Sequence, residues 1–143
     1  METRKEIAAE KRAKGYNCAQ AIGCTYCDLV GIDEKTMFKI TEGLGLGMGN
    51  MEGTCGSILG AGVIAGLLNS TANLEKPDSK VQTLKMSKEI MEKFKERNTT
   101  TICKELKGTQ TGKVIRSCAD CVRDAAEYLE DIIENIGDKN IDK

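Results

Sequence analysis

Histidine is absent from this chain of 143 residues. The absence excludes a Ser-His or Cys-His nucleophile pair, a zinc site with an imidazole ligand, a Rieske centre and a haem attached through CxxCH. Any chemistry at a functional site must therefore come from thiols, carboxylates, hydroxyls and the backbone.

Aromatic residues, proline and net charge are also scarce. Three Tyr, two Phe and no Trp leave little for base stacking, and a net charge of −1 gives no basic surface for nucleic acid or an anionic membrane. The only proline, Pro77, lies in a polar connector, residues 69–78, that is too short to link two domains. We therefore expect a single domain over residues 1–143 and no nucleic-acid partner.

Long hydrophobic runs are missing as well. The uncharged stretch from Cys55 to Leu68 would span only about 21 Å as a helix, whereas a membrane span needs about 20 apolar residues. The first fourteen residues are charged and lack the apolar segment of a secretory signal. The sequence thus predicts no membrane span and a cytoplasmic location, where structural disulfides are rare.

Glycine and cysteine, by contrast, are plentiful. Nine of the fifteen glycines lie between Gly43 and Gly66, around Cys55. Glycine at every other position from 43 to 49 predicts a loop with positive φ angles. The uncharged residues 55–68 predict a buried central helix, capped by Thr54. Its glycines would allow close approach of another backbone, either within the chain or in a homodimer.

Apolar periodicity predicts an all-α fold, a compact bundle of about five or six helices in which the glycine-rich loop leads into the central helix. A Thr3–Glu6 capping box is expected to start the first helix, and Asn17 a second helix over 18–30 that ends at Gly31. Asp33 is expected to cap a short third helix, and a Thr to cap a short helix around Cys103 that ends at Gly108. The last helix is expected over 114–136, with Gly137 as its stop. A helix over 79–97 is expected to face inward with Val81, Leu84, Met91 and Phe94. The last helix carries an apolar stripe from Cys118 and Cys121 to Ile136, followed by a solvated tail.

Three of the seven cysteines fall in the predicted first turn of a helix: Cys18, Cys55 and Cys103. The free N–H groups and the dipole at a helix start stabilise a thiolate. Cys118 is expected inside a helix that has already begun. The alternative is that these residues are small buried hydrophobes.

Two CxxC pairs, Cys24–Cys27 and Cys118–Cys121, are of the kind that suits zinc, cluster ligation or thiol exchange. The first pair is expected in mid-helix, off the apolar face, and spacing alone does not place both pairs in one site. The glycine-rich loop lacks the Lys-Ser/Thr of a P-loop, so a nucleotide site is not expected. We expect its N–H groups to donate instead to a sulfur centre at Cys55.

Four segments together resemble a known family: GYNCAQA at 15–21, CGSILG at 55–60, CKEL at 103–106 and CADCVRDAAEYLE at 118–130. They are similar to the putative redox-active proteins named for a C…CGAxxG…C…C signature, over roughly residues 6 to 130, with Ser57 where the family has Ala. The resemblance implies that Cys18, Cys55, Cys103 and Cys118 are the signature cysteines. Cys121 is the alternative to Cys118 as the fourth signature cysteine, and Cys24 and Cys27 are additional cysteines outside the signature.

Four thiolates from separate helices match the ligand count of a 2Fe–2S or 4Fe–4S cluster. An electron-transfer or cluster-binding protein is therefore the first expectation, with Cys18, Cys55, Cys103 and Cys118 as metal ligands and redox residues. Its partner would be a redox protein or a small-molecule thiol or electron donor. The alternatives are a thiol–disulfide redox protein with Cys55 as the reactive thiol, and a non-catalytic metal-binding or interaction module. All three are consistent with the four cysteines converging in space, and whether the chain is an enzyme stays open.

Overall fold

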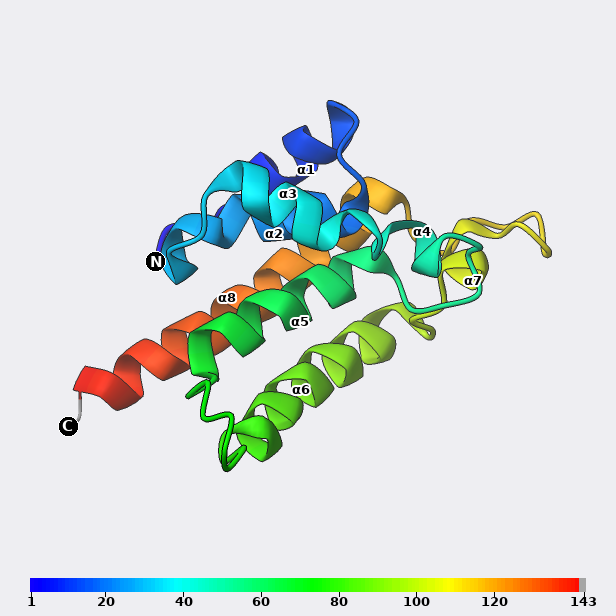
Figure 1. Cartoon of the computed structure of the whole chain (residues 1–143). Coiled ribbons are helices and arrows are strands. Elements are labelled where there is room, and N and C mark those ends of the chain that lie inside the picture. Colours follow the sequence, from blue (N-terminus) through cyan, green and yellow to red (C-terminus); the bar gives the residue numbers. More distant parts are fainter. Residues whose placement is uncertain (142–143) are drawn as a thin grey trace.

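The computed structural model of the chain describes the backbone of residues 1–141 and the side chains of residues 1–137. The helices are α1 Lys5–Ala13, α2 Cys18–Tyr26, the 3-10 helix η1 Cys27–Val30, α3 Glu34–Glu42, α4 Gly45–Met48, α5 Gly56–Asn69, α6 Lys80–Asn98, α7 Cys103–Lys107 and α8 Cys118–Ile141 (Figure 1). Residues 1–141 form no strand beyond an isolated bridge between Thr54 and Ile102. The all-α prediction is confirmed.

Helix α5 is the centre of the fold, as its lack of charge predicted. It packs against α2, α6 and α8, and lies between them in Figure 1. A Cβ atom built at Gly60 would lie 2.7 Å from the Ala19 carbonyl oxygen, so α2 crosses α5 at the glycine itself. At Gly62 and Gly66 the nearest atoms are 3.6 and 3.9 Å away, which leaves room for a methyl group. Close packing inside the chain therefore uses the first glycines of α5, and a homodimer through the later ones stays a prediction.

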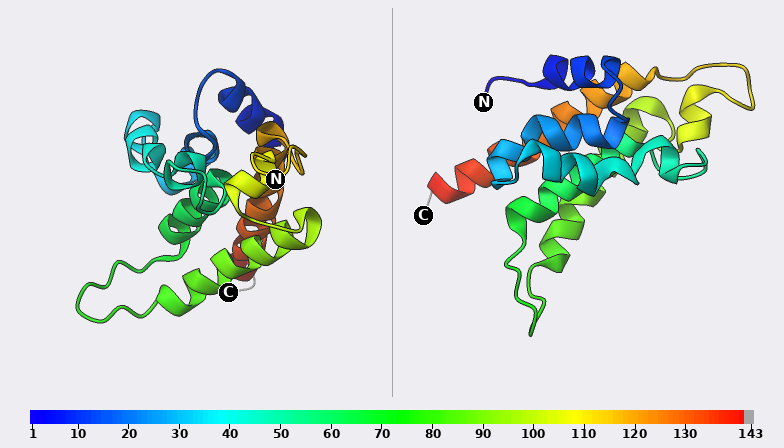
Figure 2. Two further views of the ribbon diagram at one scale, coloured as in Figure 1. Left: turned by 90° about the vertical axis from the view of Figure 1, so that its right-hand side faces the viewer. Right: turned by 45° about the horizontal axis from the view of Figure 1, so that its top comes forward.

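The direction of three helices matters for the site. Helices α2, α5 and α8 run the same way and all begin at the end of the molecule where α4 and α7 lie (Figures 1 and 2). Their N-termini, with the positive ends of their dipoles, consequently share one region.

Local capping signals were predicted well where they act within four residues. Asn17 and Gln20 form a capping box on α2, and Asp33 accepts the N–H of Thr36 at the start of α3. Gly31 and Gly108 end their helices in the left-handed conformation.

Three expected caps are wrong. The Thr3–Glu6 capping box is not formed, because the Glu6 carboxylate pairs with Arg123. Thr54 does not cap α5, which is preceded by Cys55 and has no side-chain cap; Thr54 pairs with Ile102 instead. No threonine caps α7, since its N-cap residue is Ile102.

The last helix begins and ends later than predicted. Residues 114–117 are not helical, and the Leu106 carbonyl accepts the N–H groups of both Ile115 and Arg116. The Ser117 hydroxyl then accepts the Asp120 N–H, and α8 starts at Cys118. At the other end α8 continues through Gly137 to Ile141, so Gly137 is not a stop and most of the predicted tail is helical. The last two tail residues lie outside the described part of the chain.

The inward face predicted for the start of α6 is also wrong. Val81 and Leu84 are 62% and 64% exposed, whereas Met86, Ile90 and Phe94 are buried. The connector over residues 70–79 and the first turns of α6 project from the body of the molecule (Figure 2). Burial therefore begins only where α6 reaches α5 and α8.

Candidate thiol site

Five cysteines line one small cavity at the shared end of the helices. The cavity has a volume of about 60 Å³, and its cysteines are Cys18, Cys55, Cys103, Cys118 and Cys121. The four signature cysteines do converge, although they come from distant parts of the sequence. Cys121, the rival for the fourth place, lies in the same wall as Cys118.

The convergence follows from where each cysteine stands on its helix. Cys18, Cys103 and Cys118 are the first residues of α2, α7 and α8, and Cys55 directly precedes α5. The expectation that Cys118 lies inside a helix is wrong, since residues 114–117 are not helical and α8 begins at Cys118. Because the helix N-termini meet, the thiols at those positions meet as well.

The glycine-rich loop attaches α7, and with it Cys103, to the start of α5. Leu46 and Gly47 have φ angles of 53° and 56°, so the chain turns in the left-handed region there. A Cβ at Gly47 would lie 2.7 Å from the Cβ of Cys103. The Gly53 carbonyl accepts the Cys103 N–H at 3.0 Å, and the Cys55 N–H donates to Thr101.

The expectation that loop N–H groups donate to sulfur at Cys55 is wrong. The N–H groups of Gly49, Met51 and Gly53 donate to carbonyls of the same loop. The Cys55 sulfur instead lies 3.0 Å from the hydroxyl of Ser57, the residue that replaces the family's alanine. The serine thus supplies a hydrogen bond that alanine would not.

Four of the thiols form a connected series. Cys18 interacts with both Cys118 and Cys55, and Cys55 interacts in turn with Cys121. Cys103 is coupled to Cys118 through charge alone. Cys118 is half-buried, and the other four are buried. Access from solvent is therefore best at Cys118.

Burial and neighbouring thiols keep these cysteines protonated. The pKa of Cys55 is raised to about 12, first by its interaction with Cys121 and also by burial. The pKa of Cys18 is raised to about 11: its interaction with Cys118 lowers the pKa, but Cys55 and burial outweigh it. The pKa of Cys118 is raised through its interaction with Cys18 and by burial, and that of Cys103 is raised by burial. The expected lowering at helix starts is overcome, and Cys55 is not favoured as the reactive thiol.

The charged groups that line the cavity are all cationic: Arg12, Lys107 and Arg116. The Arg12 guanidinium interacts with the thiols of Cys18 and Cys118, and its Nε is buried without a hydrogen-bond partner among the described residues. Lys107 lowers the pKa of both Cys103 and Cys118, although burial outweighs it. These cations therefore stabilise the thiolate form of the cysteines next to them.

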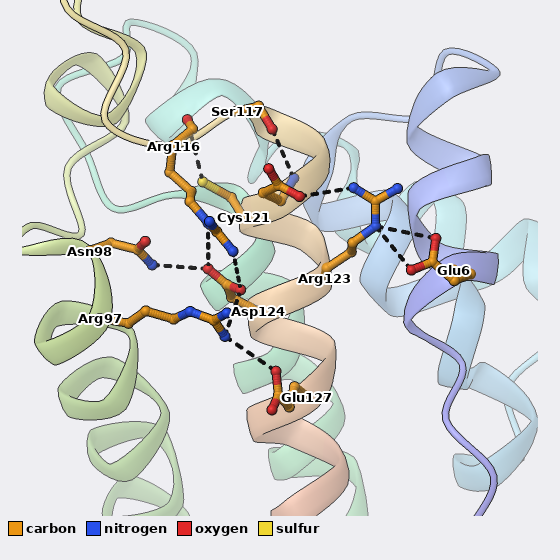
Figure 3. Close-up of polar contacts among 10 residues, drawn as sticks. Glu6, Arg97, Asn98, Arg116, Ser117, Cys121, Arg123, Asp124 and Glu127 are labelled. Atoms are coloured by element: carbon orange, nitrogen blue, oxygen red, sulfur yellow. Dashed lines mark hydrogen bonds and ion pairs between the residues drawn. The ribbon is translucent and has the colours of Figure 1, made fainter.

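An ion cluster around the buried carboxylate of Asp124 holds residue Arg116, in the segment in front of α8 (Figure 3). Arg116 makes two hydrogen bonds of 3.0 Å to Asp124, whose side chain is 2% exposed. Arg97 and Asn98 from α6 contact the same carboxylate at 3.1 Å. The Arg116 carbonyl accepts the Cys121 thiol at 3.9 Å. The sequence analysis missed this cluster, although an acidic residue beside the apolar stripe of α8 was a signal for it.

Cys24 and Cys27 lie away from the cavity, toward the far end of α2. The Cys24 thiol donates to the Glu34 carbonyl at 3.7 Å and the Cys27 thiol to the Cys24 carbonyl at 3.4 Å. Their expected position off an apolar face is wrong, since every residue of α2 is buried. Their assignment as extras outside the site agrees with this placement.

The cavity has the number of cysteines that an iron–sulfur cluster needs, but not the placement. Among the side chains of residues 1–137, no three Cys, Asp or Glu are arranged to hold a metal ion. Cluster binding therefore stays a prediction.

No helix in the described part of the chain combines the length and the apolar character that crossing a membrane requires.

A family model described as "Putative redox-active protein (C_GCAxxG_C_C)" matches residues 16–132. The matched segment contains all five cysteines of the cavity. Comparisons with curated proteins and with solved structures gave no match.

Proposed function

The chain belongs to the redox-active protein family with the C_GCAxxG_C_C signature, and from this premise we propose that it cycles between two free thiols and a disulfide of Cys18 and Cys118. In the oxidising half-cycle, one thiolate attacks an acceptor disulfide and forms a mixed disulfide. The second cysteine then displaces the acceptor's remaining sulfur, so that the acceptor leaves as two thiols and the protein holds the disulfide. A thiol donor reverses the exchange.

The observation that carries this proposal is the pair of neighbouring thiols, Cys18 and Cys118, beside the guanidinium of Arg12. A disulfide needs two sulfurs close together, and the attacking sulfur must be a thiolate. Cys118 is half-buried and next to two cations, so we assign it the first attack. Cys55 is only 5% exposed, so an external acceptor reaches Cys118 before it reaches Cys55.

The series of thiols gives the buried cysteines a role in the same cycle. Because Cys18 also interacts with Cys55, a thiolate at Cys55 is placed to attack the Cys18 sulfur of the first disulfide. That exchange would free Cys118. Cys121 is placed to attack the Cys55 sulfur in turn, which would move the disulfide to Cys55 and Cys121 and return Cys18 as a thiol. A second acceptor disulfide could then oxidise Cys18 and Cys118 again, so the site would store two disulfides.

A second candidate is binding of an iron–sulfur cluster for electron transfer. It is favoured by one observation: the four signature cysteines at helix starts around one cavity, where the positive helix ends would stabilise an anionic centre. Cys18, Cys55, Cys103 and Cys118 would be the ligands. The thiols would have to leave their present pairwise arrangement to do so.

The test begins with protein purified without oxygen and assayed for iron and acid-labile sulfide. The metal-free, reduced protein is then treated with diamide, and its free thiols are counted. We expect two of the seven thiols to be lost first. Stoichiometric iron and sulfide, together with no loss of thiols in the metal-free protein, would contradict the disulfide proposal and support the cluster.

Peptide mapping assigns the bond. Trypsin releases Cys18 together with Cys24 and Cys27 in residues 15–35, and Cys118 together with Cys121 in residues 117–123. Single Cys→Ser variants therefore have to separate the candidates. We expect the linked peptide to be lost in both the Cys18 and the Cys118 variant. It should persist in the Cys24 variant.

A further inference from the structure

We infer that the oxidant for this dithiol is a small sulfane-sulfur anion of the hydropolysulfide type, bound inside the cysteine-lined cavity between Arg12 and Lys107. Sulfane sulfur is sulfur that is bonded to sulfur and can be transferred to a thiolate. The inference rests on the dithiol function proposed above and names its substrate class.

The size of the cavity limits a molecule bound inside it to a few atoms. One buried water needs about 10–15 Å³ of such space, so 60 Å³ holds about four waters. A peptide-sized disulfide does not fit into this volume. Cys18 is buried at the cavity wall, so it closes the disulfide by attacking a sulfur that Cys118 already carries.

The charge of the lining favours an anion. No Asp or Glu lines the cavity, and of its three cations only Arg116 is neutralised, by Asp124. Arg12 and Lys107 form no ion pair with any described residue. The buried Nε–H of Arg12 also lacks an acceptor among the groups that the structure describes, and a buried donor without an acceptor costs free energy. An anion between the two cations would supply both the charge and the acceptor.

The uncharged walls favour a weakly hydrated anion over an oxyanion. They consist mainly of cysteine sulfur and the aliphatic side chains of Leu46 and Leu106. The Asn17 side chain is already used, since its oxygen accepts the Gln20 N–H and its nitrogen donates to the Glu42 carbonyl. A strongly hydrated oxyanion would lose more hydrogen bonds here than a sulfur anion, whose soft, polarisable atoms suit a sulfur-lined cavity.

The reaction balances with the hydrodisulfide ion as the simplest substrate. The Cys118 thiolate attacks the protonated sulfur of the ion; a Cys–S bond forms, the S–S bond of the ion breaks, and the departing sulfide takes up the proton lost by Cys118. Cys18 then attacks the Cys118 sulfur of this persulfide, the disulfide forms, hydrosulfide leaves, and the Cys18 proton goes to solvent. Two thiols and one hydrodisulfide ion thus give one disulfide, two hydrosulfide ions and one proton. The thiols are oxidised, and the sulfane sulfur is reduced.

The test uses reduced, metal-free protein and sodium disulfide as the probe, without oxygen. We expect release of hydrosulfide together with formation of the Cys18–Cys118 disulfide. In Cys18→Ser the second step is blocked, so the mass of the peptide with Cys118 should increase by one sulfur atom. Diamide, which is neutral, serves as the reference oxidant for every variant.

Arg12→Gln separates binding of the anion from activation of the thiol. We expect the rate with sodium disulfide, divided by the rate with diamide, to fall at least about tenfold, and Arg12→Lys to restore part of it. The exposed Lys14→Gln is the matched control and should leave the ratio unchanged. Equal losses with both oxidants would mean that Arg12 acts on the thiol alone, and would overturn the anion site.

Competition identifies the kind of anion. Sodium thiocyanate, a weakly hydrated anion, should slow the reaction with sodium disulfide, whereas sodium sulfate at equal ionic strength should not. Equal inhibition by sulfate would refute the preference for sulfur anions. Oxidation by diamide without any hydrosulfide from sodium disulfide would overturn the inference and leave the dithiol function standing. Failure of both oxidants to form the disulfide would overturn both.

Discussion

Adding one methyl group at either of two glycines of α5 should change stability in opposite directions. In Gly60→Ala, the new Cβ would lie 2.7 Å from the Ala19 carbonyl oxygen and 3.1 Å from the Cβ of Ile22. A backbone oxygen cannot swing away, so α2 would have to move. In Gly62→Ala, the nearest atom is the Ser87 hydroxyl at 3.6 Å, an ordinary contact.

The two expected effects follow from packing and helix propensity. Alanine in place of glycine inside a helix gains about 1 kcal/mol. Overpacking costs about 1–3 kcal/mol, and the rigid contact at Gly60 places it at the upper end. Gly60→Ala should therefore lower the free energy of unfolding by about 2 kcal/mol, whereas Gly62→Ala should raise it by about 1 kcal/mol. At about 3 °C per kcal/mol, the melting temperatures should differ by on the order of 9 °C.

The assay is thermal unfolding followed by far-ultraviolet circular dichroism, with both variants fully reduced. Because α2 carries Cys18, Gly60→Ala should also lower the yield of the diamide-induced disulfide with Cys118, and Gly62→Ala should leave that yield unchanged. If Gly60→Ala melts at or above the temperature of Gly62→Ala, the close approach of α2 and α5 is refuted.

Three further predictions concern the site. Asp124→Ala removes the buried carboxylate that Arg116, Arg97 and Asn98 contact. Because both arginines are partly exposed, the loss of free energy in urea unfolding should be about 1–3 kcal/mol. Glu127→Gln, at an exposed pair, should stay within about 0.5 kcal/mol, and similar losses in the two variants would contradict the stabilising role of Asp124. The pKa of Cys55 is about 12 in the folded protein and about 9 in the unfolded chain. The free energy of unfolding should therefore decrease as the pH rises from about 9 to about 12. In Cys55→Ser this decrease should be smaller. Substoichiometric iodoacetamide should label Cys118 before Cys55, at a rate that rises about tenfold per pH unit between about pH 7 and 9; earlier labelling of Cys55 would contradict the assigned order of access.

The sequence by itself determined the parts of this protein that depend on residues within about one helical turn of each other. The caps at Asn17 and Asp33 and the left-handed stops at Gly31 and Gly108 are bonds or dihedral preferences of neighbouring residues. The absence of histidine likewise limited the chemistry to thiols without any knowledge of the fold.

Tertiary structure decided where the chain departs from its local signals. The segment before α8 is held by residues outside it: the Leu106 carbonyl accepts the N–H groups of Ile115 and Arg116, and Asp124 binds the Arg116 side chain. Gly137 remains helical because glycine inside a helix costs only about 1 kcal/mol, and a helix as long as α8 absorbs that cost. The Ser117 hydroxyl, which accepts the Asp120 N–H, was a local signal for the start at Cys118, whereas no residue next to Gly137 indicated that the helix continues through it.

The protonation of the thiols was the property that only the assembled fold could determine. Position at a helix start favours a thiolate, and from the sequence that was the only visible influence on Cys55. In the fold, Cys121 comes to lie beside Cys55, and together they are buried, so the pKa rises instead of falling. The residues that bury Cys55 and the thiol next to it come from helices that are far apart in sequence. They act on its pKa at short range, and so only after those helices have packed.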